Sequence, residues 1–114
     1  MALKIDADLI AVPSVTGLPA TLKLRQTLKS NIPNGEAAQI VYTVQGDGKV
    51  VFEGGGTTFE VAGILVPNSP LTREDTVGLV WVGETAASPA EVVIDQEIMG
   101  VENTRHDSVV IAVQ

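Results

Sequence analysis

The side chains best suited to acid–base chemistry are two neighbours near the end of the chain. His106 is the single histidine among the 114 residues, and Asp107 follows it directly. Imidazole and carboxylate groups can move protons or bind a metal, but neighbouring residues of an extended chain point to opposite sides. We therefore expect residues 100–108 to form a solvated polar loop that makes contacts, with no catalytic residue in it.

Other acidic and glycine-rich patterns also fall short of a site. Asp6 and Asp8 form a D-x-D pair and Asp47 lies between two glycines, but the remaining acceptors of a calcium loop are not spaced around them. Gly54–Gly56 precedes a β-like run, whereas a phosphate-binding glycine loop opens a helix. The chain has no Cys and no HExxH, GxSxG or P-loop pattern. We expect no enzyme, no metal and no other cofactor, and a weak calcium site is the one alternative left open.

The charge balance limits the partners. Seven basic side chains stand against 14 acidic ones, which gives a net charge of −7 at pH 7. Nucleic acids and anionic membranes attract basic proteins, so neither is an expected partner. The first residues include acids where a secretion signal would be apolar, and no apolar stretch is long enough to span a membrane. The expected partners are proteins.

Apolar and polar residues alternate with a period of two through most of the chain. Between Thr21 and Lys29 leucines alternate with polar residues, and Gln26 is the one polar interruption on the apolar face. This is the pattern of a strand with one buried face. Similar runs occupy residues 3–12, 39–45, 49–53, 57–62, 76–82, 90–99 and 108–113. The pattern predicts an all-β fold of about eight strands, a sandwich or a small barrel, with one helical turn at most, at residues 71–76. Of the two architectures we favour a single antiparallel β-sandwich.

Turn residues separate these runs and divide the chain. The sequence Gln45-Gly46-Asp47-Gly48-Lys49 predicts a hairpin that makes runs 39–45 and 49–53 antiparallel neighbours. Residues 13–114 form the expected sandwich domain. Residues 1–12 are either its first strand or an arm that adds to the sheet edge of a neighbouring subunit.

One segment carries a family resemblance. Glu74-Asp75-Thr76-Val77-Gly78-Leu79-Val80-Trp81 resembles the sixth-strand signature of immunoglobulin-type sandwiches, Asp-Thr-Ala-x-Tyr-x-Cys. Asp75 and Thr76 match, whereas Leu79 replaces the tyrosine and Trp81 replaces the cysteine. The resemblance implies an immunoglobulin-like sandwich in which this segment is the sixth strand.

Two features predict an interface. Apolar residues share one side of the N-terminal run, and three of the seven bases share one strand face, whereas residues 84–102 hold five acids and no base. The charged stripes are either sheet neighbours that pair or faces turned toward different partners. The predicted interface residues are Leu3, Ile5, Leu9, Lys23, Arg25, Lys29, Arg105 and His106.

The surplus of apolar residues predicts assembly. Runs 76–82 and 108–113 are apolar on both sides, although a two-layer sandwich buries only one side of each strand. The short, acidic, cysteine-free all-β profile is similar to the decoration (cement) proteins of tailed-phage capsids. That resemblance implies a non-catalytic structural protein on the virion surface, made in the host cytoplasm, which binds capsid protein and forms a trimer or dimer. The alternative is an immunoglobulin-like binding module of an extracellular or cell-surface filament or adhesin.

Overall fold

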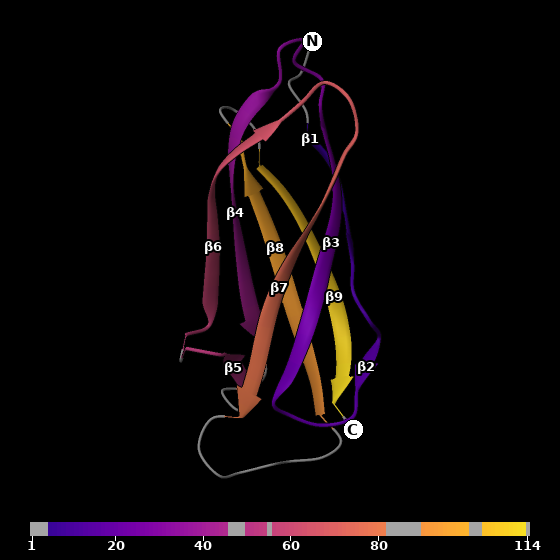
Figure 1. Cartoon of the computed structure of the whole chain (residues 1–114), viewed down its shortest axis with the longest axis vertical. Helices are drawn as coiled ribbons and strands as arrows, with labels where there is room; N and C mark the ends of the chain where they lie inside the picture. The colour runs from indigo at the N-terminus through magenta and orange to yellow at the C-terminus, as the bar shows by residue number, and fades with distance from the viewer. Residues whose placement is uncertain (1–4, 46–49, 55, 82–89, 101–103, 114) are drawn as a thin grey trace.

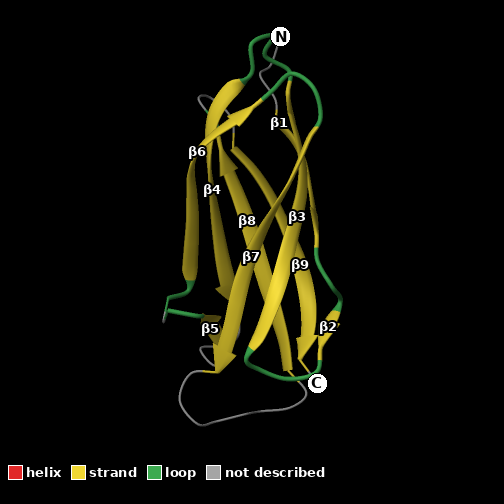
Figure 2. Ribbon diagram, in the orientation of Figure 1, coloured by secondary structure: helices red, strands yellow, loops and turns green. Residues whose placement is uncertain are grey.

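A computed structural model of the chain describes residues 5–45, 50–54, 56–81, 90–100 and 104–113. These residues form nine strands and no helix (Figures 1 and 2). The strands are β1 (Ile5–Ile10), β2 (Ser14–Val15), β3 (Ala20–Ser30), β4 (Glu36–Gln45), β5 (Val50–Phe52), β6 (Thr58–Val66), β7 (Leu71–Trp81), β8 (Ala90–Met99) and β9 (Thr104–Val113). In this part of the chain no helix could cross a membrane.

The strands pack as two sheets. Sheet A has the order β1-β3-β7-β5 and sheet B the order β2-β9-β8-β4-β6. Neighbours are antiparallel, except that the two-residue strand β2 runs parallel to β9. Sheet A occupies the positions of strands A, B, E and D of an immunoglobulin domain, and β9, β8 and β4 occupy those of G, F and C. The predicted immunoglobulin-like sandwich is confirmed, with nine strands in place of about eight.

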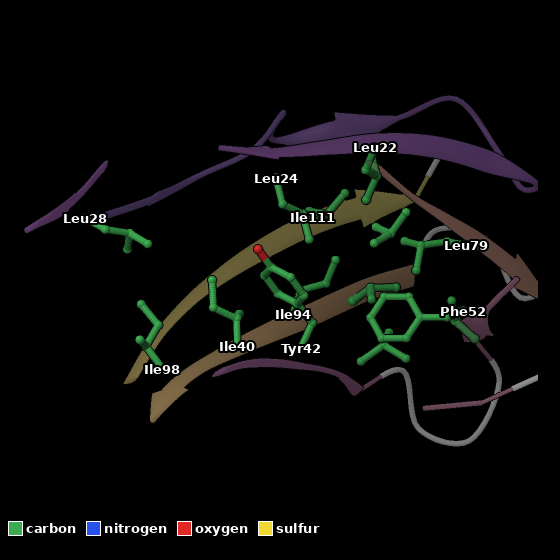
Figure 3. Close-up of a cluster of buried hydrophobic side chains, with 14 of the residues drawn as sticks. Leu22, Leu24, Leu28, Ile40, Tyr42, Phe52, Leu79, Ile94, Ile98 and Ile111 are labelled. Carbon is green, nitrogen blue, oxygen red and sulfur yellow. The ribbon is translucent and has the colours of Figure 1, made fainter. Parts of the chain in front are cut away.

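The core lies between the sheets and follows from the alternation seen in the sequence. In β3 the side chains of Leu22, Leu24 and Leu28 are buried, while the residues between them are exposed. The side chains of sheet B that face them in Figure 3 include Ile40, Ile94, Ile98 and Ile111. Full burial of one such side chain stabilises the fold by roughly 1.5–3 kcal/mol. This apolar layer therefore holds the two sheets together.

The predicted hairpin between residues 39–45 and 49–53 is wrong. Strand β4 pairs with β6 and β8 in sheet B, whereas β5 pairs with β7 in sheet A. Its turn, residues 46–49, lies outside the described residues. The alternation in β5 is real, because Val50 and Phe52 are both buried. A glycine-rich link can join two strands as a hairpin within one sheet or connect strands of different sheets. The residue types of the turn alone therefore do not show which of the two connections forms.

Several strands are longer than the sequence predicted, and two of the added segments contain charged residues that point inward. Residues 71–76, considered for a helical turn, form the first half of β7, and the end of the predicted loop at 100–108 is the start of β9. In the first half of β7 and at the start of β9, charged residues occupy positions that point inward. They replace the apolar residues expected at every second position of a half-buried strand. The extended backbone persists because these charged side chains pair with each other, as described below.

The immunoglobulin signature lies on a different strand from the one expected. Glu74–Trp81 belongs to β7, which lies between β3 and β5 in sheet A. That is the position of an immunoglobulin E strand, while the sixth-strand position between β9 and β4 is taken by β8. The sixth-strand assignment is wrong, although the fold class that it implied is right.

The long outer edge of sheet B is interrupted by a bulge. The pairing of β6 with β4 changes register between Ala38 and Ile40, and Gly63 of β6 has a φ of 73°. A bulge at an edge strand disfavours pairing with a strand of another molecule. At the β1 edge of sheet A, the exposed Asp8 places a charge that has the same effect. The outer faces of the sheets are therefore better suited to partners than the edges are.

Candidate interaction surfaces

The outer face of sheet A carries the basic stripe. Lys23, Arg25 and Lys29 are exposed on β3 and point away from the core. The Oε2 atom of Glu74 on β7 lies 3.3 Å from Nη2 of Arg25. The Oε1 atom of the same side chain lies 3.9 Å from Nζ of Lys23. Ion pairs this exposed contribute up to about 1 kcal/mol each. These ion pairs therefore contribute little to the stability of the fold. An acidic partner could replace Glu74 in them at little cost in stability.

Two apolar side chains are exposed beside these bases. Ile10, at the end of β1, is 61% exposed, and Val12 is 50% exposed. The strand register places Ile10 opposite Arg25. Both apolar residues line a shallow depression together with Lys23 and Arg25. We call Ile10, Val12, Lys23, Arg25 and Lys29 the basic face.

The outer face of sheet B carries the acidic stripe. Glu91, Asp95 and Glu97 point outward from β8, and no Lys or Arg side chain points outward from the described strands of this sheet. Glu97 contacts His106 of β9 at 3.1 Å, from Oε2 to Nε2, and Asp95 accepts a hydrogen bond from Gln45. This stripe differs from the basic one in both charge and direction.

An exposed valine lies among these acids. Val110 of β9 is 54% exposed and lies opposite Val93 of β8. Two residues to either side of Val93 on the same face are Glu91 and Asp95, so the valine is flanked diagonally by two carboxylates. We call Glu91, Asp95, Glu97 and Val110 the acidic face.

The structure separates the predicted interface residues into three places. The three bases of β3 lie together on the basic face, and His106 lies on the opposite side of the molecule, beside Glu97. Leu9 packs against the core, and Arg105 lies on the inner side of β9, with its side chain 41% exposed. Ile5 begins β1, opposite Ser30, and Leu3 lies outside the described residues. The charged stripes belong to different sheets, so they are not the neighbours that one interpretation assumed.

The histidine and the aspartate of the sequence analysis belong to a strand and not to a loop. His106 points outward to Glu97, whereas the next residue, Asp107, points inward and accepts a hydrogen bond of 3.3 Å from Nε of Arg105. The two side chains therefore lie on opposite sides of sheet B. Each has a partner of its own, and they form no joint acid–base pair. Among the described residues, no three His, Cys, Asp or Glu side chains are grouped so that they could hold a metal ion.

A polar cluster that the sequence analysis missed connects the two sheets. Asp75 of β7 accepts two hydrogen bonds from Arg73, at 2.7 and 3.0 Å, and one from the Tyr42 hydroxyl of β4 at 2.7 Å. Gln26 of β3 donates to Asp75 at 3.2 Å and accepts from Arg73 at 3.3 Å. The side chains of Arg73 and Asp75 are 21% and 11% exposed. Tyr42 belongs to sheet B and the other three to sheet A, so the cluster fixes how the sheets lie on each other.

The environment of Tyr42 keeps its hydroxyl protonated. Burial, and next the hydrogen bond to the Asp75 carboxylate, raise the pKa of Tyr42 above its ordinary value of about 10. The unfolded chain releases this proton near pH 10, while the folded chain retains it. Its contribution to stability is therefore complete below pH 10 and is lost as the pH rises above that value.

A buried glutamine in sheet B has no partner for its amide among the described residues. Gln96 of β8 is 0% exposed and lies in register between Tyr42 of β4 and Asp107 of β9. Neither its side-chain nitrogen nor its oxygen makes a hydrogen bond with another of the residues that the structure describes. A buried polar group left without a partner costs about 1–3 kcal/mol. Gln96 therefore weakens the fold where it stands.

We expect Gln96→Met to raise the free energy of unfolding by about 1–3 kcal/mol, because methionine has a similar length and no amide to satisfy. Urea denaturation followed by the fluorescence of Trp81, the single tryptophan, measures this change. The matched control is Gln26→Met in the other sheet, which removes an amide bonded to Asp75 and Arg73 and should lower the free energy. A loss of stability in Gln96→Met as large as in Gln26→Met would show that the Gln96 amide is satisfied in solution.

Comparison with known proteins adds information at the level of the fold. No family model matches the chain, and no curated protein sequence matches it. The structure is similar to that of a FixG-related protein from Vibrio parahaemolyticus, with a TM-score of 0.55, 14% identity and coverage of 96% of each chain. It is also similar to Spo0M, a sporulation control protein from Bacillus subtilis, with a TM-score of 0.56 and 12% identity. The alignment covers 100% of this chain and 51% of Spo0M, so the chain spans about half the length of that protein.

A third solved structure is more distant. The CooA pilin subunit from enterotoxigenic Escherichia coli aligns over 94% of this chain and 95% of its own, with 11% identity and a TM-score of 0.40. The first two similarities, at 14% identity or less, concern the fold alone, which the chain shares with these two solved structures.

Proposed function

We propose that the chain is a non-catalytic binding module of an extracellular or cell-surface structure, and that it works by contacting proteins with the outer faces of its sandwich. The observation that carries the proposal is the exposure of Ile10, Val12 and Val110 on these faces, each beside charged side chains. Apolar side chains framed by charges are typical of protein contact sites. Immunoglobulin-like sandwiches are also a common architecture of cell-surface domains.

The interior favours binding over catalysis. The inner polar side chains of the cluster, Tyr42, Arg73, Asp75 and Gln26, bond to one another and fasten the sheets together. The depression on the outer face of sheet A is open, and the one on the outer face of sheet B is about half open to solvent. Protein interfaces need broad faces of this kind, whereas small-molecule sites are concave and enclosed.

The capsid-decoration hypothesis receives no support from these observations. The two similar structures with TM-scores above 0.5 are those of a FixG-related protein and a sporulation control protein, and neither is described as a capsid protein. Nothing in the described strands is specific to a capsid lattice. We therefore base the proposal on the filament or adhesin alternative of the sequence analysis.

The absence of native cysteine allows a direct test of the location. We expect Asn34→Cys, at an exposed turn, to react with a membrane-impermeant maleimide on intact cells as fully as after permeabilisation. The matched control, Val92→Cys, is buried and should react only after the chain is denatured. Labelling of Asn34→Cys that requires permeabilisation would overturn the surface location.

A further inference from the structure

The two outer faces have complementary patterns. On the basic face an exposed isoleucine, Ile10, lies beside Lys23 and Arg25. On the acidic face an exposed valine, Val110, lies between Glu91 and Asp95. Each face thus has an exposed apolar side chain beside two charges of one sign, basic on sheet A and acidic on sheet B. On the basic face Glu74 lines the same depression and pairs with both bases, and Asp8 is also exposed. The basic face of one copy is therefore complementary to the acidic face of a second copy of the chain.

We propose that copies of this chain associate face to back, with the basic face of one copy on the acidic face of the next. This inference rests on the proposed function, because it assumes that the outer faces bind protein and names a second copy of the chain as that protein. Within each contact, Glu91 and Asp95 of one copy would replace Glu74 as partners of Lys23 and Arg25 on the next. The exposed apolar side chains Ile10 and Val110 would be buried at the centre.

The positions of the faces determine the kind of assembly. The basic face belongs to sheet A and the acidic face to sheet B, so they point in opposite directions from the same molecule. A contact between two different patches is heterologous, and it leaves one patch unused at each end. Association therefore continues past the dimer and produces a stack. Because packed sheets lie about 10 Å apart, each added copy lengthens the stack by about 20 Å.

The size of the faces is sufficient for such contacts. The molecule measures 49 × 21 × 20 Å along its principal axes, so an outer face offers an area on the order of 1,000 Å². A standard protein interface buries about 800 Å² on each partner. The net charge of −7 opposes the approach of identical copies, but the Debye length of about 8 Å at physiological salt screens it beyond the contact itself.

The test uses two variants that each remove one face without creating a new attraction. The first combines Ile10→Thr with Arg25→Thr, and the second combines Val110→Thr with Glu91→Thr. All four positions are exposed, and threonine suits strands. Circular dichroism and urea denaturation would establish that both variants keep the fold.

Light scattering over about 10 µM to 1 mM, at an ionic strength of 0.15 M, reads the result. We expect the average mass of the unchanged chain to grow beyond twice the monomer mass of 11.9 kDa as concentration rises, and to return toward the monomer at 1 M salt. Each variant alone should remain a monomer. An equimolar mixture of the two should stop at the dimer, because only one intact face of each kind is present.

A matched control replaces an exposed apolar residue and an acid elsewhere on sheet B. Leu65→Thr with Glu60→Thr changes edge strand β6, two strands away from β8, and should leave the growth of the mass unchanged. A monomer at all concentrations, a closed dimer that both face variants still form, or an equal loss of association in the β6 control would each overturn the face-to-back contact. None of these outcomes would affect the labelling of Asn34→Cys on intact cells, which tests the proposed function separately.

Discussion

Asp75→Ala is expected to lower the free energy of unfolding by about 3 kcal/mol or more. The substitution leaves the Arg73 guanidinium, only 21% exposed, without its bidentate partner, and it removes the acceptor of Tyr42 and Gln26. Breaking a buried ion pair by removing one partner typically costs 3–5 kcal/mol, because the remaining charge is uncompensated. Domains of this size are stable by about 5–15 kcal/mol, so a large part of the total would be lost. Urea denaturation monitored by Trp81 fluorescence measures the loss.

The neighbouring acid supplies the control for this prediction. Glu74→Ala removes a carboxylate from the same strand, but one that pairs with Lys23 and Arg25 at the surface. Its effect should stay below about 1 kcal/mol. Replacing both members of the buried pair, with Arg73→Leu and Asp75→Leu together, should recover much of the stability lost in Asp75→Ala. Equal effects of Asp75→Ala and Glu74→Ala would contradict a structural role for the buried cluster.

The cluster also explains which parts of the fold could be predicted. The sequence predicts strand β3 because its inward residues are mostly leucine, which makes the period of two visible. The first half of β7 and the start of β9 were not recognised, because their inward positions hold charged side chains. Both contain the pattern Arg-x-Asp, at Arg73 and Asp75 and again at Arg105 and Asp107. Residues two apart share a face of a strand, so this spacing itself indicates a paired inward arginine and aspartate.

The pairing of strands depended on contacts that no local pattern contains. The alternation in β5 was visible, but a three-residue strand can join either sheet, and burial of Val50 and Phe52 beside β7 decides the outcome. The candidate surfaces were predictable to the same limited degree. The spacing of the bases of β3 is enough to place them on one face. The sequence does not show that Ile10 and Val110 lie beside charged residues, because this depends on the register of β1 with β3 and of β9 with β8.

The second large effect concerns the outer faces in the cell. We expect a photo-reactive benzoylphenylalanine placed at Ile10 or at Val110 to form covalent adducts with protein when cells that make the chain are illuminated. These side chains are 61% and 54% exposed and lie at the centres of the two charged faces, where a bound partner would cover them. The same group at Asn34, an exposed turn residue between β3 and β4, should form few or none. The evidence for binding is a higher yield of adducts at positions 10 and 110 than at position 34, because an adduct at one position alone could come from a chance collision.

Photo-crosslinking at these three positions is the most direct test of the claim that the outer faces of the sandwich bind proteins. If the outer faces bind proteins, discrete adducts form at positions 10 and 110 and are nearly absent at position 34. Adducts between copies of the chain would identify a second copy as the partner, and adducts with another protein would identify that protein. Either pattern supports binding by the outer faces. Illumination that yields no adduct at positions 10 and 110, or the same adducts at all three positions, would contradict it.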